Sequence, residues 1–155
     1  MVYQLEKSIW MDEDFDLMGW HDATIWSVVP DPDAAEFSLD LDYIFQWVHP
    51  APDETYFKFQ VAPVTMVFHA VTSMSISVAT GFGPIEVDDL IRGEADPAWG
   101  GQRRYQFLCH EGEVSVTAER FTMHVRRQPR LSSNGQRFTL AERGGISFAR
   151  PAQAD

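Results

Sequence analysis

Between Phe37 and Trp47 the chain reads FSLDLDYIFQW, in which apolar side chains occupy every odd position. Most even positions are polar, among them Asp40 and Asp42. A period of two over this length predicts a long β-strand with one face in the core and the other in solvent. Asp40 and Asp42 are therefore interpreted as solvated acids, although two carboxylates at this spacing could also bind a hard cation with neighbouring acids.

The chain on either side of this strand continues the β pattern. Residues 25–29 are rich in β-branched side chains, and the turn residues PDPDAA at 30–35 predict a hairpin with the long strand. Residues 57–68 also alternate, but the apolar parity changes at Ala62–Pro63, which predicts a bulge or bend there. Parity changes again at Glu119–Arg120. Two such breaks indicate a sheet that curls, as barrels and sandwiches do.

Shorter strand-like segments fill most of the remaining chain, whereas helix signals are few. One helical turn is predicted over residues 12–18, where an aspartate could cap it, and another over 88–92. Alternation predicts further strands at 74–78, 85–87, 104–109, 114–118, 121–125, 138–140 and 146–148. The sequence therefore predicts a mainly β, single-domain protein over residues 1–155, built as an antiparallel β-sandwich, roll or open barrel with one or two short helical turns.

Composition supports one domain in a reducing compartment. With 155 residues, 45% of them hydrophobic, the chain can bury a sizeable core. Cys109 is the single cysteine, which excludes an intrachain disulfide and a cysteine-only zinc site. The first residues lack a basic segment followed by an apolar run, and the most apolar stretch, 61–71, is interrupted by polar residues. We therefore expect a cytoplasmic protein outside the membrane.

The charge distribution is uneven along the chain. The net charge is −11, which disfavours nucleic acid and anionic membranes as partners. Residues 1–100 carry 18 acidic against 3 basic side chains, whereas residues 101–155 carry 5 against 9. Either the late arginines lie beside the early acids within the domain, or the surface is dipolar and steers a charged partner.

The densest unusual cluster is the run Met18-Gly19-Trp20-His21-Asp22, with Trp26 shortly after it. His21 with Asp22 could act as a general base or a metal ligand with its orienting carboxylate. Adjacent residues of an extended segment point to opposite faces, however. The alternative is a structural turn that Trp20 holds in place, with its polar groups satisfied locally.

Motifs for catalysis or cofactor binding are not found in the sequence. The five histidines form none of the usual metal-binding spacings, and the glycines at 81 and 83 lack the rest of a dinucleotide fingerprint. Cys109 shares its parity with apolar neighbours and is interpreted as a core thiol. We therefore expect no metal and no cofactor, and we assign no catalytic residue, so that enzymatic activity is uncertain and disfavoured.

Five tryptophans are many for a chain of this length. Trp47 belongs to the alternating apolar row and is predicted to lie in the core. Trp10 and Trp99 lie in irregular acidic or glycine-rich segments, which favours an exposed contact surface or a pocket rim. Together with Trp20, His21, Asp22 and Trp26, they are the candidate ligand or interface residues.

Three segments carry a family resemblance. They are FDLMGWHDATIW at 15–26, DLDYI at 40–44 and APVTMVF at 62–68. Together they resemble a family of uncharacterised small bacterial β-rich proteins, over most of the chain; that family has no assigned activity. The start W-H-D-x-x-I before an acidic alternating strand is also similar to immunity proteins of polymorphic-toxin systems. This second resemblance implies a cytoplasmic binding role and transfers no site residue.

These observations favour a non-enzymatic interaction module, immunity-like, that binds a cationic protein partner. On this hypothesis Trp10 and Trp99 are anchors, and steering comes from the acids of one short segment, Asp12, Glu13, Asp14 and Asp16. The alternative is a curled sheet that binds a small ligand in a pocket near Trp20, His21 and Trp26. A hydrolase or isomerase that uses His21 is a third hypothesis. A homodimer is compatible with all three.

Overall fold

A computed structural model describes residues 2–81, 83–133 and 135–155 of the chain. Strands make up most of it, and the helical segments are short. The elements in chain order are β1 (Ile9–Met11), the 3-10 helix η1 (Asp12–Leu17), β2 (Thr24–Asp31), β3 (Glu36–Val48), β4 (Lys58–His69), β5 (Ser73–Val78), β6 (Ile85–Arg92), η2 (Pro97–Trp99), β7 (Arg103–Cys109), β8 (Gly112–Ala118), β9 (Arg120–Val125), β10 (Arg130–Leu131) and α1 (Leu140–Arg143).

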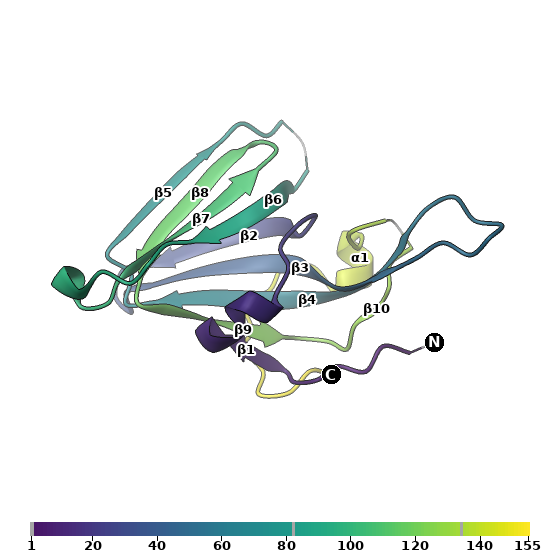
Figure 1. The fold of residues 1–155 in the computed structure, drawn as a ribbon, viewed down its shortest axis with the longest axis horizontal. Coiled ribbons are helices and arrows are strands. Elements are labelled where there is room, and N and C mark those ends of the chain that lie inside the picture. The colour runs from purple at the N-terminus through teal and green to yellow at the C-terminus, as the bar shows by residue number, and fades with distance from the viewer. Residues whose placement is uncertain (1, 82, 134) are drawn as a thin grey trace.

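The strands form one open antiparallel sheet in the order β1-β9-β4-β3-β2-β6-β7-β8-β5, with β10 paired to β4. A short contact between β2 and β6 joins its two halves, through Thr24 and Ile25 opposite Glu86 and Ile85. In Figure 1 the half with β5, β8, β7 and β6 is tilted over the half with β2, β3, β4, β9 and β1. The expected mainly β, antiparallel fold with only short helical turns is confirmed.

The core lies between the two halves and is rich in aromatic side chains. Phe68 and Phe121 of the lower half in Figure 1 contact Tyr105 and Phe107 of the upper half, with ring centroids 4.8 to 6.1 Å apart. All four side chains are fully buried. These rings fill the space between the two halves of the sheet at this point.

Strand β4 is straight where the sequence predicted a bend. Its register against β3 continues through Ala62 and Pro63, which pair with Tyr43 and Asp42. The apolar parity changes because both faces of β4 are buried. Ala62 belongs to the main core, whereas Phe59 and Val61 pack with Phe138 on the opposite face. The predicted break at Glu119–Arg120 is confirmed, since β8 ends at Ala118 and β9 begins in the other half of the sheet.

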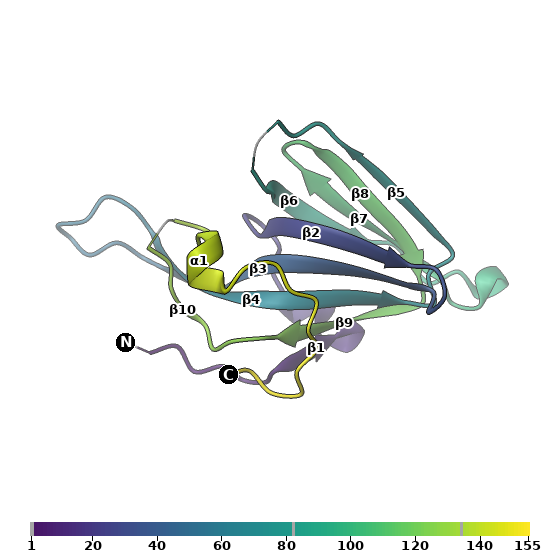
Figure 2. The ribbon, with the colours of Figure 1, turned by 180° about the vertical axis from the view of Figure 1, so that it is seen from behind.

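The C-terminal segment, residues 135–155, covers that opposite face. Figure 2 shows it running from α1 across β3 and β4 toward β1. Helix α1 begins at a capping box in which Thr139 and Glu142 satisfy each other's backbone N–H groups. The strands predicted at 138–140 and 146–148 are wrong, because the first stretch is irregular and leads into α1 and the second is irregular.

Asp40 and Asp42 lie beneath this segment and are fully buried, so their predicted solvation is wrong. Arg143 donates Nη2 and Nη1 to the two carboxylate oxygens of Asp40, at 2.6 and 2.8 Å, and Nε to Asp42 at 3.1 Å. Arg126 adds a bond of 2.7 Å to Asp40, and Trp26 Nε1 donates to Asp42 at 3.0 Å. We refer to these five side chains as the buried ionic network.

The buried ionic network confirms that late arginines lie beside early acids. The covering segment adds two backbone bonds to this network, since Ser147 N–H donates to Asp40 and Phe138 N–H to Asp42. Burial lowers the pKa of Arg143, but its bonds and charge contacts with both aspartates outweigh that effect and raise the pKa. The arginine therefore stays charged and fixes the segment to the sheet.

Two further predictions are settled by the backbone. The helical turn near residue 12 is confirmed as η1, whereas residues 88–92 are part of strand β6. Among the residues that the model describes, no helix is long and apolar enough to cross a membrane.

Candidate functional site

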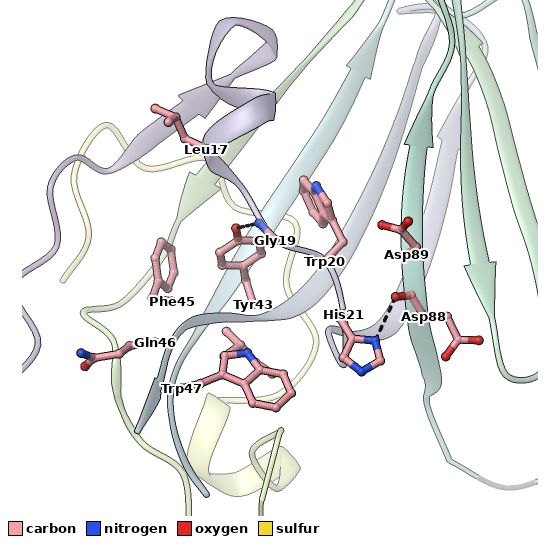
Figure 3. A pocket seen from close by; sticks show the side chains of 11 residues that line it. Leu17, Gly19, Trp20, His21, Tyr43, Phe45, Gln46, Trp47, Asp88 and Asp89 are labelled. Carbon is pink, nitrogen blue, oxygen red and sulfur yellow. Dashed lines mark hydrogen bonds between the residues drawn. The ribbon is translucent and has the colours of Figure 1, made fainter. Parts of the chain in front are cut away.

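A surface hollow lies where the loop after η1 passes between β3 and β6. It has a volume of about 600 Å³. Figure 3 shows its side chains converging from three separate stretches of the chain. The lining residues are Leu17, Gly19, Trp20, His21, Tyr43, Ile44, Phe45, Gln46, Trp47, Asp88 and Asp89. We call this hollow the aromatic pocket.

The loop that carries Gly19 to Asp22 is fixed at both ends. The Gly19 N–H donates to the Tyr43 hydroxyl at 2.9 Å, and the Asp22 N–H donates to the Val87 carbonyl at 2.9 Å. Burial raises the pKa of Tyr43 to about 12, so its hydroxyl stays protonated while it accepts this bond. Asp22 has a φ of 67°, a left-handed conformation that aspartate tolerates better than most residues.

This left-handed turn changes the relation between His21 and Asp22. Extended neighbours would point apart, but here the His21 Nε2 lies 3.7 Å from Asp22 Oδ2. The other ring nitrogen, Nδ1, donates to the Asp88 carbonyl at 3.1 Å. Figure 3 shows the imidazole at the mouth of the aromatic pocket, and its side chain is mostly exposed. His21 is therefore oriented by β6 and accessible to a ligand.

Aromatic rings form the wall and floor of the pocket. Trp20 is buried and contacts Tyr43 edge-on at 5.3 Å, and Tyr43 contacts Phe45 at 4.7 Å. The indole N–H of Trp20 has no hydrogen-bond partner within the described part of the chain. Trp47 stacks on His21 with the ring planes 11° apart. A ligand in the hollow would therefore meet π-faces and ring edges.

Trp47 is 40% exposed, so its predicted place in the core is wrong. The register between β3 and β4 shifts between Ile44 and Gln46, which is a β-bulge. The bulge takes Trp47 out of the buried row that ends at Tyr43. The indole of Trp47, which the alternation assigned to the core, therefore lines the pocket.

The pocket continues onto a protruding hairpin, which we call the aromatic arm, formed by residues 47–58. In Figures 1 and 2 this hairpin extends beyond the rest of the sheet. Tyr56 is 81% exposed, Phe57 is 40% exposed, and Phe57 contacts both Trp47 and His49. Exposed aromatic side chains next to a pocket are typical of an interaction surface.

The opposite wall of the aromatic pocket is acidic. Asp88 and Asp89 are both exposed, and within the described part of the chain no lysine or arginine lines the pocket or is bonded to them. Asp88 Oδ1 lies 2.5 Å from the Nε2 of His110. Asp89 accepts the N–H of Leu90 and no other donor among the described residues. Within that part of the chain, the basic side chain paired with this acidic wall is a histidine, His110.

His110 links this wall to a second acid. Its Nδ1 lies 3.3 Å from Glu86 Oε2, and the charge of Glu86, followed by that of Asp88, raises the pKa of His110. Burial raises the pKa of Glu86, and the nearby Asp22 carboxylate raises it further. No group of three or more metal-ligating side chains is found among the described residues.

The remaining candidates from the sequence lie elsewhere. Trp26 is on the far face of the sheet, where it belongs to the buried ionic network. Trp10 is buried with 7% exposure, so its predicted exposure is wrong; its indole donates to the Lys7 carbonyl and its ring packs on Phe45. Trp99 is 73% exposed on η2 but does not line the aromatic pocket.

The predicted steering acids are largely used inside the molecule. Asp12 accepts bonds from the Tyr105 hydroxyl and the Phe121 N–H, and Asp14 is buried against Lys7. Only Glu13 and Asp16 of this group are exposed. Asp88 and Asp89, the acids that line the aromatic pocket, are adjacent in the sequence, and the pairing of β6 with β2 brings them beside His21.

Comparisons with known proteins give no match. No family model matches the chain, and neither the curated proteins nor the solved structures contain a significant match. The resemblance to uncharacterised bacterial proteins therefore stays a prediction. Function has to be inferred from the aromatic pocket itself.

Proposed function

We propose that the protein is a non-enzymatic binding module whose aromatic pocket takes a lysine or arginine side chain from a cationic protein partner. One observation carries this proposal: the pocket combines π-faces with the exposed carboxylate of Asp89, has the exposed Asp88 beside it on the same strand, and among the described residues has no lysine or arginine in its lining. Cations are attracted to such faces by about 0.5–2 kcal/mol, and carboxylates add a charge-assisted hydrogen bond.

The geometry suits a side chain inserted from outside. The aliphatic part would pack on Trp47 and Phe45, while the charged end reaches the Asp89 carboxylate on the opposite wall. An arginine has a planar fork that can bind a carboxylate with two hydrogen bonds and stack on an indole. We therefore expect arginine to be preferred over lysine.

The aromatic arm favours a macromolecular partner over a free small molecule. Tyr56 and Phe57 extend the apolar surface beyond the reach of any ligand held only by the pocket. Tyrosine and tryptophan are enriched among residues that dominate interface energies. The net charge of −11 would accelerate encounter with a basic partner.

The alternative from the sequence, a small-ligand pocket near Trp20, His21 and Trp26, uses part of the same hollow. Trp20 and His21 line it, whereas Trp26 does not. A free organic cation would satisfy the pocket walls but would leave the aromatic arm unoccupied. The two proposals therefore differ in whether the arm contributes to affinity.

The test is a titration of the ¹⁵N-labelled protein with two capped peptides, Ac-Gly-Arg-Gly-amide and Ac-Gly-Gln-Gly-amide, followed by NMR. We expect the arginine peptide to shift the signals of Trp20, His21 and Trp47, and the glutamine peptide to leave them unchanged. The variant D88N/D89N should lose most of this response. The control E94Q/E119Q removes the same charge at exposed positions outside the pocket and should retain it.

A longer peptide separates the two proposals. An arginine peptide with flanking leucines should bind more tightly than the tripeptide, and the double substitution Y56A/F57A should abolish that gain. Equal affinities for both peptides, unaffected by the arm, would favour a free cation as ligand. Identical responses to arginine and glutamine would refute the cation pocket altogether.

A further inference from the structure

The two ends of the open sheet differ in how they are protected. Strand β1 at one end has three residues and is flanked by the charged residues Lys7 and Asp12. Strand β5 at the other end has six residues, Ser73–Val78, without a charge or a proline. Natural edge strands are usually kept short, charged, bulged or covered, because free N–H and C=O groups pair with other strands.

Strand β5 also keeps a regular geometry along its whole length. Its register against β8 runs from Ser73 opposite Thr117 to Val78 opposite Gly112 without a shift. Figures 1 and 2 both show β5 at the open end of the upper half, away from β1. The edge is therefore straight enough to serve as a template for another strand.

The two faces of β5 are chemically distinct. Met74 and Ile76 lie opposite the buried Val116 and Val114, so they continue the core face of the sheet. They are nevertheless 46% and 45% exposed. The serines of β5 lie on the other face, beside Ser115 and its polar neighbours. An additional strand would cover the exposed end of the core.

We propose that β5 pairs with β5 of a second copy, antiparallel and about a two-fold axis at Ile76. In this register Ile76 faces its own equivalent, Met74 faces Val78, and Ser75 faces Ser77. Every apolar side chain then lies on the core face of the joint sheet, and every serine lies on the polar face. The proposal does not depend on the function of the aromatic pocket.

A second copy fits this edge because the strand is self-complementary. Antiparallel pairing by a two-fold axis requires the same surface to match itself, as in isologous dimers. A register shifted by one residue would place serines against apolar residues and expose the core face. The strand SMSISV carries no charge, so its two copies do not repel each other locally.

Long-range charge gives this interface a distinctive salt dependence. Each copy carries a net charge of −11, and the repulsion between two such copies is screened by salt. Dimer affinity should therefore rise with salt. Binding of a cationic partner in the aromatic pocket should instead weaken, which separates the two associations in one experiment.

The first test is sedimentation velocity over a concentration series of the full chain, with a matched pair of variants. I76K places two lysines opposite each other at the proposed axis and should raise the dimer Kd by about tenfold or more. I91K is the control, because Ile91 has nearly the same exposure, 44% against 45%, but lies on the interior strand β6. Circular dichroism establishes that both variants are folded.

The second test examines the register. Opposed residues of an antiparallel pair lie within disulfide distance, so I76C should cross-link two copies under mild oxidation. M74C should cross-link far less, because its equivalent lies several residues away along the pair. The wild type is the blank: burial raises the pKa of the native Cys109 thiol to about 12, which makes it unreactive.

Two results would overturn the proposal. One is a wild-type protein that remains monomeric at about 100 μM and high salt, since weaker association would not persist as a specific dimer. The other is a dimer that I76K leaves intact, because its interface would then lie on another face.

Discussion

Two pairs of aspartates show how differently acidic residues can be used in one sheet. Asp40 and Asp42 on β3 are fully buried and bonded to arginines, whereas Asp88 and Asp89 on β6 are exposed at the aromatic pocket. Both pairs lie in strands of the same mainly β fold. What separates them is that the C-terminal segment covers one pair and leaves the other in solvent.

The comparison teaches that an acid becomes structural when the chain supplies its counter-charge. Arg143 comes from more than one hundred residues beyond Asp40 and occupies both of its oxygens. No equivalent arginine reaches Asp89 within the described residues. The first pair therefore determines stability, and the second pair is available to a partner.

The largest expected effect comes from removing the counter-charge of the buried pair. R143A leaves Asp40 and Asp42 buried with much of their charge uncompensated, which should cost about 3–5 kcal/mol of unfolding free energy. Urea denaturation measures this loss. R150A is the control: Arg150 pairs with Glu36 at a partly exposed site, and its loss should cost about 0–1 kcal/mol. Equal losses would mean that burial does not distinguish the pairs.

A tryptophan substitution on each face of the sheet separates stability from binding. W26F removes the indole N–H that Asp42 accepts and should cost about 1–3 kcal/mol, with no effect on the arginine peptide. W47A removes a half-exposed side chain from the wall of the aromatic pocket. It should weaken peptide binding about threefold or more, because a cation–π contact is lost. Denaturation and NMR titration on the same samples measure both effects. A reversed pattern would contradict the assignment of roles.

Neutralising the exposed pair should leave stability nearly unchanged. D88N/D89N is expected to change the unfolding free energy by no more than about 0.5 kcal/mol, because both acids are exposed and the pair that Asp88 makes with His110 is itself about half exposed. Its effect should be confined to binding of the arginine peptide. A large destabilisation would show that these acids are structural after all, and would remove the basis of the pocket proposal.

The smallest effect is a pH dependence at His110. The charges of Glu86 and Asp88 raise the pKa of His110 in the folded state. The attraction between the charged imidazole and these two acids is therefore fully present below the unfolded pKa of about 6.5, and it is lost as pH rises through the folded pKa. Once His110 is neutral, the Asp88 carboxylate no longer has a charged partner. The arginine peptide should therefore bind more tightly as pH is raised from about 6 to 8. The variant H110N should bind equally at both pH values; a dependence that persists in H110N would assign it to another group.

Much of the fold was predictable from local pattern. The alternation that begins at Phe37 predicted β3, and the turn before it predicted the hairpin with β2; both are confirmed. The failures share one cause, which is that side chains far along the chain decide what a strand face meets. Asp40 looked solvated and the parity change at Ala62–Pro63 looked like a bend because the covering segment is not visible in either stretch.

The candidate site was only partly predictable. Trp20 and His21 stood out as an unusual cluster, and they do line the aromatic pocket. Asp88 and Asp89 were missed as site residues, since the sequence suggested a helical turn there. Trp47 was assigned to the core because a single bulge, between Ile44 and Gln46, leaves no mark in the apolar pattern. Local irregularities of the backbone, absent from residue spacing, create the pocket.

The distance along the chain between Asp40 and Arg143 has a consequence for how the protein is made. A ribosome that has completed β4 at His69 has 57 residues still to add to reach Arg126 and 74 to reach Arg143 of α1. Until these arginines are made, a sheet face flanked by apolar residues carries two uncompensated charges, which keep it hydrated and hinder its association with other nascent chains. Arg143 removes that protection only when the covering segment arrives. The same two carboxylates thus hinder association of the incomplete sheet and later bind the covering segment to the complete one.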